Sequence, residues 1–177
     1  MWLLPEIPLD ENNVSRELAA PVVQSELASL ANKMSSRDIR RQEQHNKSLV
    51  RQMFQEVIER EELDEQAVAR YFSPRYVQKV DGKTLNFADF VDHVRELKRT
   101  VTNLRVTFEH MVSEGNKIMD IHRVEADKRV GVKITARVIS LWIIEDGKIV
   151  LCDELTHLDK GAPDDYDLGS RKSVAKS

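Results

Sequence analysis

Hydrophobic residues recur with a helical period in the first half of the chain. Between residues 44 and 60 they form one stripe along about four helical turns, and the stripe consists of Leu49, Val50, Met53, Phe54, Val57 and Ile58. Comparable patterns predict further helices over residues 64–73 and 86–101. Asp64 and Asn86 are suitable N-cap residues for these two helices. The first part of the domain is therefore predicted to be helical.

The hydrophobic period changes from 3.6 to 2 after Thr102, which is typical of strands with one buried face. The strands predicted from the sequence, including a short one before the third helix, span residues 76–80, 103–113, 117–126, 130–145 and 148–158. Turn signals separate the last four strands, and Asp146-Gly147 is the clearest of them. Three helices followed by a consecutive meander indicate an α+β domain in which the helices cover one face of an antiparallel sheet.

The Asp146-Gly147 turn also predicts which residues of the last hairpin share a face. A regular two-residue turn places Glu154 opposite Ile139, and Cys152 opposite Leu141. The other face of the hairpin is then also apolar, with Val138, Trp142, Ile144, Ile149, Leu151 and Leu155 along it. Because the helices can cover only one face, we expect a second subunit to cover the other. The pattern therefore predicts a homodimer that associates through the outer face of the sheet.

Composition and charge exclude several classes of protein. The chain has 177 residues, with 27 basic and 30 acidic side chains and a net charge of −3, which argues against general binding of nucleic acids. No apolar run approaches the roughly 20 residues that a membrane helix needs, and the first residues lack the basic region of a signal peptide. We therefore expect a cytoplasmic protein that contacts neither nucleic acids nor membranes.

The domain organisation follows from where the regular pattern begins and ends. Prolines and a polar stretch interrupt residues 1–42, which we interpret as an N-terminal extension that is partly disordered or helical. The patterned part covers residues 43–160. Residues 161–177 are rich in polar side chains and are predicted to be a C-terminal tail.

The order of helices and strands resembles the NTF2-like superfamily, in particular its SnoaL-like branch. The stretches that carry the resemblance are 46–58, 71–77 and 143–150, and the similarity covers residues 43–158. It implies a cone, in which three N-terminal helices pack on one strongly curved antiparallel sheet around a deep pocket. It also implies dimerisation through the outer sheet face, in agreement with the two apolar faces of the last hairpin.

Glu154 is the first candidate for a catalytic residue. The resemblance implies this role, because Glu154 matches the position of an acid/base aspartate in SnoaL-like enzymes. An apolar setting beside Ile139 and Leu141 would raise the pKa of its carboxyl group and favour proton transfer near neutrality. An ion pair with Arg137 or Lys79 would instead lower the pKa, and Glu154 would then anchor a ligand.

Asp120 and His122 are the second candidates. They are two positions apart on one predicted strand, so their side chains face the same side, and the carboxylate could orient the imidazole for acid/base catalysis. Lys79, Arg137 and Tyr76 are predicted to bind the substrate, the two cations by stabilising developing negative charge. The five histidines show no paired ligand spacing and the chain has one cysteine, so no metal site and no cofactor are expected.

The superfamily contains polyketide cyclases, a ketosteroid isomerase and dehydratases as well as non-catalytic binding modules, so the fold does not select a reaction. One hypothesis is a small-molecule pocket protein that works as a cofactor-independent isomerase, cyclase or dehydratase on a small hydrophobic or polar-aromatic molecule. The alternative is a non-catalytic module that binds a hydrophobic ligand or a protein partner. The sequence leaves both open.

Overall fold

The structure is a computed structural model that describes residues 35–172. The chain divides into two units after Arg41, and residues 42–172 of the second unit are the domain described below. Residues 35–41, in the first unit, are helical. Most of the predicted N-terminal extension and the end of the predicted tail lie outside the described residues.

The three predicted helices are present in the domain. Residues 42–53 are α-helical and continue as one π-helical segment, η1 (Phe54–Ile58), and we call these residues the N-terminal helix. The other two helices are α2 (Glu65–Tyr71) and α3 (Phe87–Thr100). Asp64 caps α2, because its side chain accepts hydrogen bonds from the backbone N–H groups of Gln66 and Ala67. Asn86 caps α3 in the same way.

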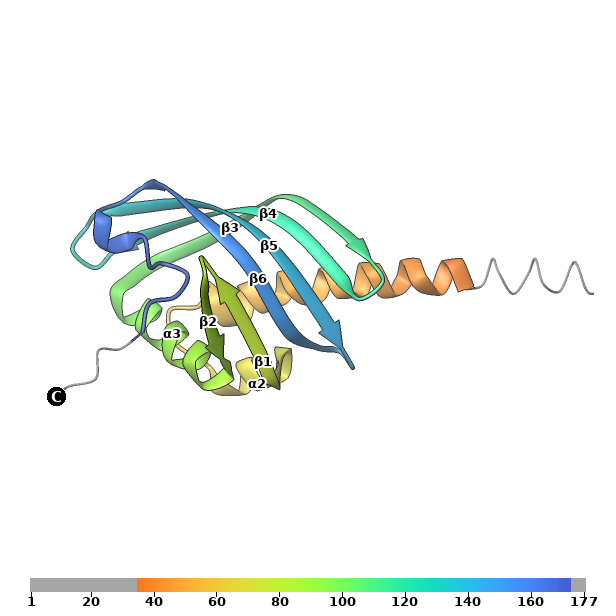
Figure 1. The fold of residues 1–177 in the computed structure, drawn as a ribbon. Helices are drawn as coiled ribbons and strands as arrows, with labels where there is room; N and C mark the ends of the chain where they lie inside the picture. The colour runs from red at the N-terminus through yellow and green to blue at the C-terminus, as the bar shows by residue number, and fades with distance from the viewer. Residues whose placement is uncertain (1–34, 173–177) are drawn as a thin grey trace, which may run out of the picture. The chain divides into compact units, whose positions relative to one another are not determined.

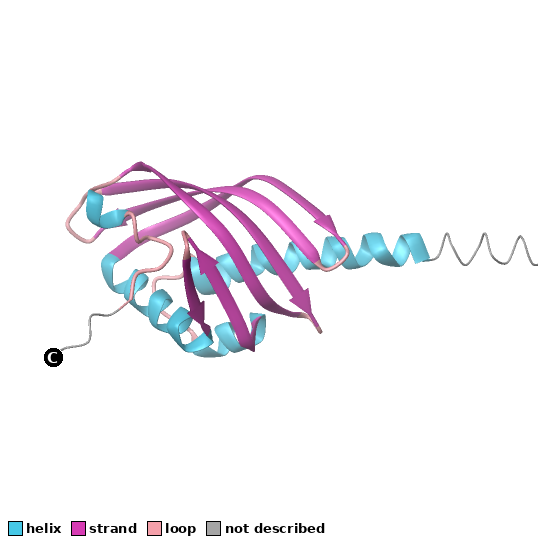
Figure 2. Cartoon of the chain, viewed as in Figure 1, coloured by secondary structure: helices cyan, strands magenta, loops and turns pink. Residues whose placement is uncertain are grey.

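The six strands form one curved sheet with the helices on its concave side (Figures 1 and 2). The strands are β1 (Phe72–Val80), β2 (Lys83–Asn86), β3 (Val101–Glu114), β4 (Lys117–Lys128), β5 (Lys133–Glu145) and β6 (Lys148–Lys160). Their order in the sheet is β2-β1-β6-β5-β4-β3, and β2 is a strand that the sequence analysis does not predict. The α+β class and the curved sheet are confirmed, but β1 runs parallel to β6, so the sheet is mixed and not purely antiparallel.

The last hairpin departs from the predicted register. Asp146 and Gly147 both have positive φ, at 49° and 72°, as a two-residue hairpin turn requires, and Ile144 faces Ile149 as expected. The next pair is Ile143 with Leu151, so Val150 is an extra residue in β6. Such a β-bulge moves every following side chain of β6 to the opposite face from the one predicted.

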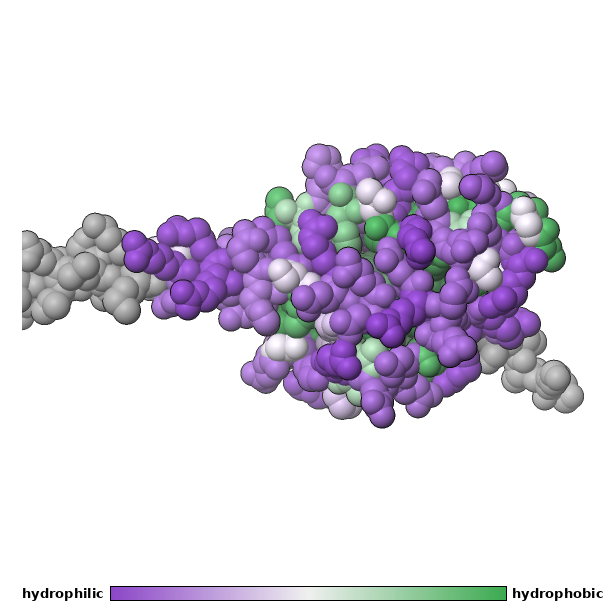
Figure 3. Space-filling view, turned by 180° about the vertical axis from the view of Figure 1, so that it is seen from behind, coloured by the Kyte–Doolittle hydropathy of each residue, from purple (hydrophilic) through white to green (hydrophobic). Residues whose placement is uncertain are grey.

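The bulge reverses the assignment of the two faces. Trp142 faces Cys152, Ser140 faces Glu154 and Val138 faces Thr156, all on the concave side. The predicted outer patch is therefore wrong for four of its members, because Val138, Trp142, Ile144 and Ile149 are buried in the core. The apolar side chains that are exposed on β3 to β6 are instead Val112, Met119, Ile139 and Leu155. The surface seen in Figure 3 is mainly hydrophilic, with hydrophobic residues in small groups.

Part of the predicted C-terminal tail packs on the domain. The short helical turn η2 (Pro163–Asp165) precedes Leu168. Leu168 is buried and packs in one cluster with residues of α3, β3, β4 and β5. Arg171 holds this segment in place by donating hydrogen bonds to Thr100 Oγ1 at 3.0 Å and to Asp167 Oδ1 at 2.8 Å. Residues 161–172, called the C-terminal segment below, are therefore part of the fold.

Candidate functional site

A pocket opens between the concave face of the sheet and the helices. Its cavity volume is about 80 Å³, and its mouth is open to solvent. Its lining is mainly apolar and aromatic, and its polar side chains include Gln78, His93, His122, Glu154 and Thr156. No lysine or arginine is among the described residues that line it. Leu168 and Gly169 of the C-terminal segment complete the wall.

Asp120 and His122 form the hydrogen-bonded pair that the sequence predicts. Both side chains lie on the concave side of β4, and Asp120 Oδ1 is 2.6 Å from His122 Nδ1. Trp142 Nε1 donates to the other carboxylate oxygen, Oδ2, at 2.7 Å. Because both oxygens of Asp120 accept N–H groups, His122 Nδ1 carries a hydrogen, and Nε2 is the ring nitrogen left for chemistry.

The ring of His122 is fixed by packing as well as by this hydrogen bond. Phe54, in the π-helical segment, places its ring edge-on to His122 at 5.0 Å and to Trp142 at 5.7 Å between centroids. The side chains of Asp120 and His122 are 0% and 3% exposed. The sequence analysis misses Trp142 as the second partner of Asp120, because the predicted register puts Trp142 on the outer face.

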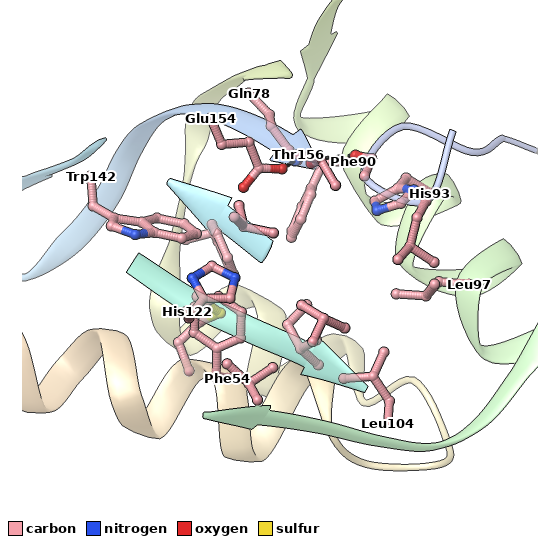
Figure 4. Close-up of a pocket in the computed structure, with 18 of the residues that line it drawn as sticks. Phe54, Gln78, Phe90, His93, Leu97, Leu104, His122, Trp142, Glu154 and Thr156 are labelled. Carbon is pink, nitrogen blue, oxygen red and sulfur yellow. Dashed lines mark hydrogen bonds between the residues drawn. The ribbon is translucent and has the colours of Figure 1, made fainter. Parts of the chain in front are cut away.

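Glu154 lies in the same pocket and points toward its interior, across from His122 (Figure 4). Gln78 Nε2 donates to Glu154 Oε1 at 2.7 Å, and Cys152 Sγ donates to Oε2 at 3.5 Å. Burial raises the pKa of the Glu154 carboxyl group above its ordinary value, and the charge of His122 and these two hydrogen bonds oppose the rise. The sequence therefore predicts the right residue for the pocket, although its neighbours are Trp142 and Ser140, not Ile139 and Leu141.

Tyr76 also lines the pocket, as predicted for a substrate-binding residue, and it is almost fully buried. Burial raises the pKa of its hydroxyl group well above the ordinary value, and the neighbouring Cys152 and Glu154 add to the effect. Burial and Glu154 likewise raise the pKa of the Cys152 thiol. Both groups therefore stay protonated near neutral pH, and Cys152 is a hydrogen-bond donor here and not a nucleophile.

Lys79 and Arg137 do not reach the pocket, which corrects the prediction that they bind the substrate. Lys79 is exposed on β1, because Gln78 takes the inward position of that strand. Arg137 is on the outer face of β5, where its Nη2 forms an ion pair with Glu109 at 3.0 Å. The alternative in which Glu154 pairs with one of these cations is therefore wrong.

His93 is a pocket residue that the sequence analysis does not single out. It lies on α3 and its Nδ1 is 2.8 Å from the backbone oxygen of Arg171, in the C-terminal segment. Gly169 of the same segment also approaches the site closely, because a Cβ at this position would lie 3.3 Å from Glu154 Oε1. Neither contact has a local sequence signal, since each joins elements far apart in the chain.

Within the described residues, no three histidine, cysteine, aspartate or glutamate side chains are grouped so that they could hold a metal ion. The same part of the chain contains no helix that is both long and apolar enough to cross a membrane.

Comparison with known proteins agrees with this architecture. A family model described as a SnoaL-like domain matches residues 50–152. An uncharacterized protein of Schizosaccharomyces pombe is 32% identical over 127 residues, which are 72% of this chain and 97% of that protein.

Among solved structures, AclR of Streptomyces galilaeus, provisionally described as a hydroxylase, has a TM-score of 0.58 at 18% identity and covers 74% of this chain and 89% of its own. An LEH-like epoxide hydrolase of M. tuberculosis has a TM-score of 0.55 at 14% identity, and the alignment covers 65% of this chain and 84% of the hydrolase. At these identities the structures share the fold, and their names indicate different reactions. The family match covers more than half of the chain and leads to one conclusion: the chain belongs to the SnoaL-like domain family.

Proposed function

We propose that the protein is an enzyme that moves a proton within a small, uncharged molecule, as in an isomerisation, cyclisation or dehydration, without a cofactor. The observation that carries the proposal is the pair of proton-transfer groups in one apolar pocket, Glu154 and the His122 ring held by Asp120. In general acid/base catalysis, one such group can take up a proton while a second donates a hydrogen bond or proton to the reacting molecule.

Each group has a defined part in the proposed step. The Glu154 carboxylate accepts a proton from a carbon next to a carbonyl group, and the electron pair of the broken C–H bond forms the enol double bond. The carbonyl oxygen gains the displaced electron pair and receives the Nε2 proton of His122, which enters the step as an imidazolium with hydrogens on both ring nitrogens and leaves it neutral. Asp120 fixes the ring and offsets the positive charge that it carries when both nitrogens are protonated. Return of the proton to another atom completes an isomerisation.

Within residues 35–172, Glu154 forms no ion pair with a lysine or arginine, which favours this function over the non-catalytic alternative. A carboxylate in an ion pair with lysine or arginine would be a weak base, whereas burial raises the pKa of Glu154. Binding of a hydrophobic ligand without turnover is the competing outcome of the experiment below.

We also propose that the protein is a homodimer that associates through the outer face of the sheet, as expected from the sequence, but with Leu155 as the one exposed side chain that the predicted patch and the proposed interface share. Val112, Met119, Ile139 and Leu155 are 65%, 49%, 47% and 66% exposed, and they lie on strands that follow one another in the sheet. Side chains of this kind are usual in subunit interfaces. The cytoplasmic location stays a prediction.

The test of the enzymatic function uses exchange of carbon-bound hydrogen. The protein is incubated in deuterated water with 2-tetralone, a small uncharged ketone, and loss of the α-proton signals is followed by NMR. The wild type should accelerate exchange, and Glu154→Gln should reduce the acceleration by about 10²-fold or more. Asp153→Asn is the matched control, because Asp153 is the next residue of β6 and is exposed. Equal exchange by wild type and Glu154→Gln would support the non-catalytic alternative.

A further inference from the structure

His93 has a fixed protonation state that its surroundings define. A backbone carbonyl oxygen only accepts hydrogen bonds, so the 2.8 Å contact between His93 Nδ1 and the oxygen of Arg171 requires a hydrogen on Nδ1. Burial lowers the pKa of the His93 ring to about 4, so the ring is neutral near pH 7. Its other nitrogen, Nε2, is therefore a lone-pair acceptor without a hydrogen.

This acceptor lies at the end of the pocket away from His122. Figure 4 shows His93 and Leu97 on one side of the pocket, and His122 and Trp142 on the other. His93 is 5% exposed, and apolar side chains of Leu97, Leu104 and Leu168 line the pocket with it. An acceptor in such surroundings is costly unless a donor reaches it.

A second acceptor, the amide oxygen of Gln78, is buried without a donor. Gln78 is 5% exposed, and its Nε2 donates to Glu154 Oε1 at 2.7 Å and to the backbone oxygen of Gly169 at 3.3 Å. These two bonds fix the orientation of the amide, and the buried Oε1 then has no hydrogen-bond partner within residues 35–172. The pocket thus offers a ligand the lone pair of His93 Nε2, and no lysine or arginine among the described residues lines it to attract an anion.

We infer that the ligand of this pocket is an uncharged, mainly apolar molecule that carries a hydroxyl or N–H group, and that this group donates a hydrogen bond to Nε2 of His93. His93 is then a specificity-determining residue, which orients the molecule with its other end at His122 and Glu154. The orientation rests on the proposed function, whereas the preference for a donor does not.

The test compares three ligands of one size: 2-naphthol, which has a donor, 2-methoxynaphthalene, which has none, and 2-naphthoate, which is an anion. Isothermal titration should show that the wild type binds 2-naphthol about tenfold more tightly than 2-methoxynaphthalene, and 2-naphthoate more weakly than 2-naphthol. His93→Phe should abolish the preference, and His93→Gln, which offers a carbonyl acceptor, should restore part of it. His157→Phe is the matched control, because the His157 side chain is 82% exposed.

The inference would be overturned if the wild type bound 2-naphthol and 2-methoxynaphthalene equally well, or if it bound 2-naphthoate more tightly than 2-naphthol. It would also be overturned if none of the three ligands showed saturable binding, or if His93→Phe kept the preference for 2-naphthol. If His93→Phe does not fold, ¹⁵N NMR of the histidine-labelled wild type decides, because a hydrogen on Nε2 of His93 contradicts the inference and a hydrogen on Nδ1 supports it. Hydrogen exchange that is unaffected by Glu154→Gln, together with a retained donor preference, would reject the proposed reaction alone.

Discussion

The two faces of strands β3 to β6 carry polar side chains under opposite conditions. On the concave face, Asp120 accepts from both His122 and Trp142 and is fully buried. On the outer face, Glu109 accepts from Arg123 and Arg137 at 3.5 and 3.0 Å, and both arginine side chains are nearly half exposed. Side chains of a strand point alternately to the two faces. The hydrogen-bond network on the concave face is therefore needed for stability, whereas the ion pairs on the outer face contribute little to it. The free-energy cost of removing one hydrogen-bond or ion-pair partner therefore depends on the burial of the remaining group more than on the number of bonds lost.

The largest expected difference between the faces is in stability. Asp120→Ala leaves the Trp142 N–H and the His122 ring without a buried acceptor, so the free energy of unfolding should fall by about 3–4 kcal/mol. Glu109→Ala removes exposed ion pairs and should cost less than about 1 kcal/mol. Urea unfolding at pH 7 measures both. Similar losses in the two variants would contradict the contrast between the faces.

A second difference concerns the response of two histidines to pH. His93 is buried with a pKa of about 4, below its ordinary value of 6.5, because desolvation outweighs the effects that raise it. These are the hydrogen bond to the Arg171 backbone oxygen and the charges of Asp167 and Asp92, whereas the charge of Arg171 adds to the lowering. The unfolded chain therefore binds more protons between these two values, and stability is lost as the pH falls from 6.5 to 4. The full loss is about 3 kcal/mol.

Urea unfolding of the wild type, His93→Phe and His157→Phe between pH 7 and 4 tests this expectation. The steep part of the pH dependence should disappear in His93→Phe and stay in His157→Phe. A pH dependence that is the same in all three proteins would show that His93 is not the group responsible.

The helices, the meander and the Asp146-Gly147 turn could be predicted because each has a local signal: a hydrophobic period, a capping residue or a pair with positive φ. The extra residue Val150 has no such signal, since it is an ordinary β-branched residue in a strand. Its effect on the fold is large, because one inserted residue moves Trp142 to the side of Glu154 and Cys152.

The polar part of the pocket could be predicted only where both partners lie on one element. Asp120 and His122 are two residues apart on β4, so their pairing follows from strand geometry. The contacts of His93 with Arg171 and of Gln78 with Gly169 join residues 78 and 91 positions apart. A local sequence pattern carries no information on pairs so far apart in the chain. The polar composition of the C-terminal segment also gives no sign that it lines the pocket.

The candidate base should show an effect of opposite sign from that of His93. Burial raises the pKa of Glu154 above the ordinary 4.5, so the folded state binds more protons than the unfolded chain just above this pH. The contribution of Glu154 to stability is therefore present below pH 4.5 and is lost as the pH rises through its folded-state pKa. Glu154→Gln should gain stability relative to the wild type over this interval, whereas Asp153→Asn should not. A difference between wild type and Glu154→Gln that is constant from pH 4 to 8 would argue against the raised pKa.

The smallest effect on folding is expected on the outer face, at Leu155. The side chain is 66% exposed, so Leu155→Asp should change the free energy of unfolding of the subunit by only about 0.5 kcal/mol. The same charge should dissociate the proposed homodimer, because it would be buried without a partner in a two-fold interface and would occur there twice. Sedimentation should therefore show a dimeric wild type and a folded, monomeric Leu155→Asp. Val138→Asp, on the concave face of the neighbouring strand, should instead unfold the protein, since Val138 is 5% exposed in the core. A wild type that sediments as a monomer at high concentration would contradict the homodimer, and the four exposed apolar side chains would then need no second subunit to cover them.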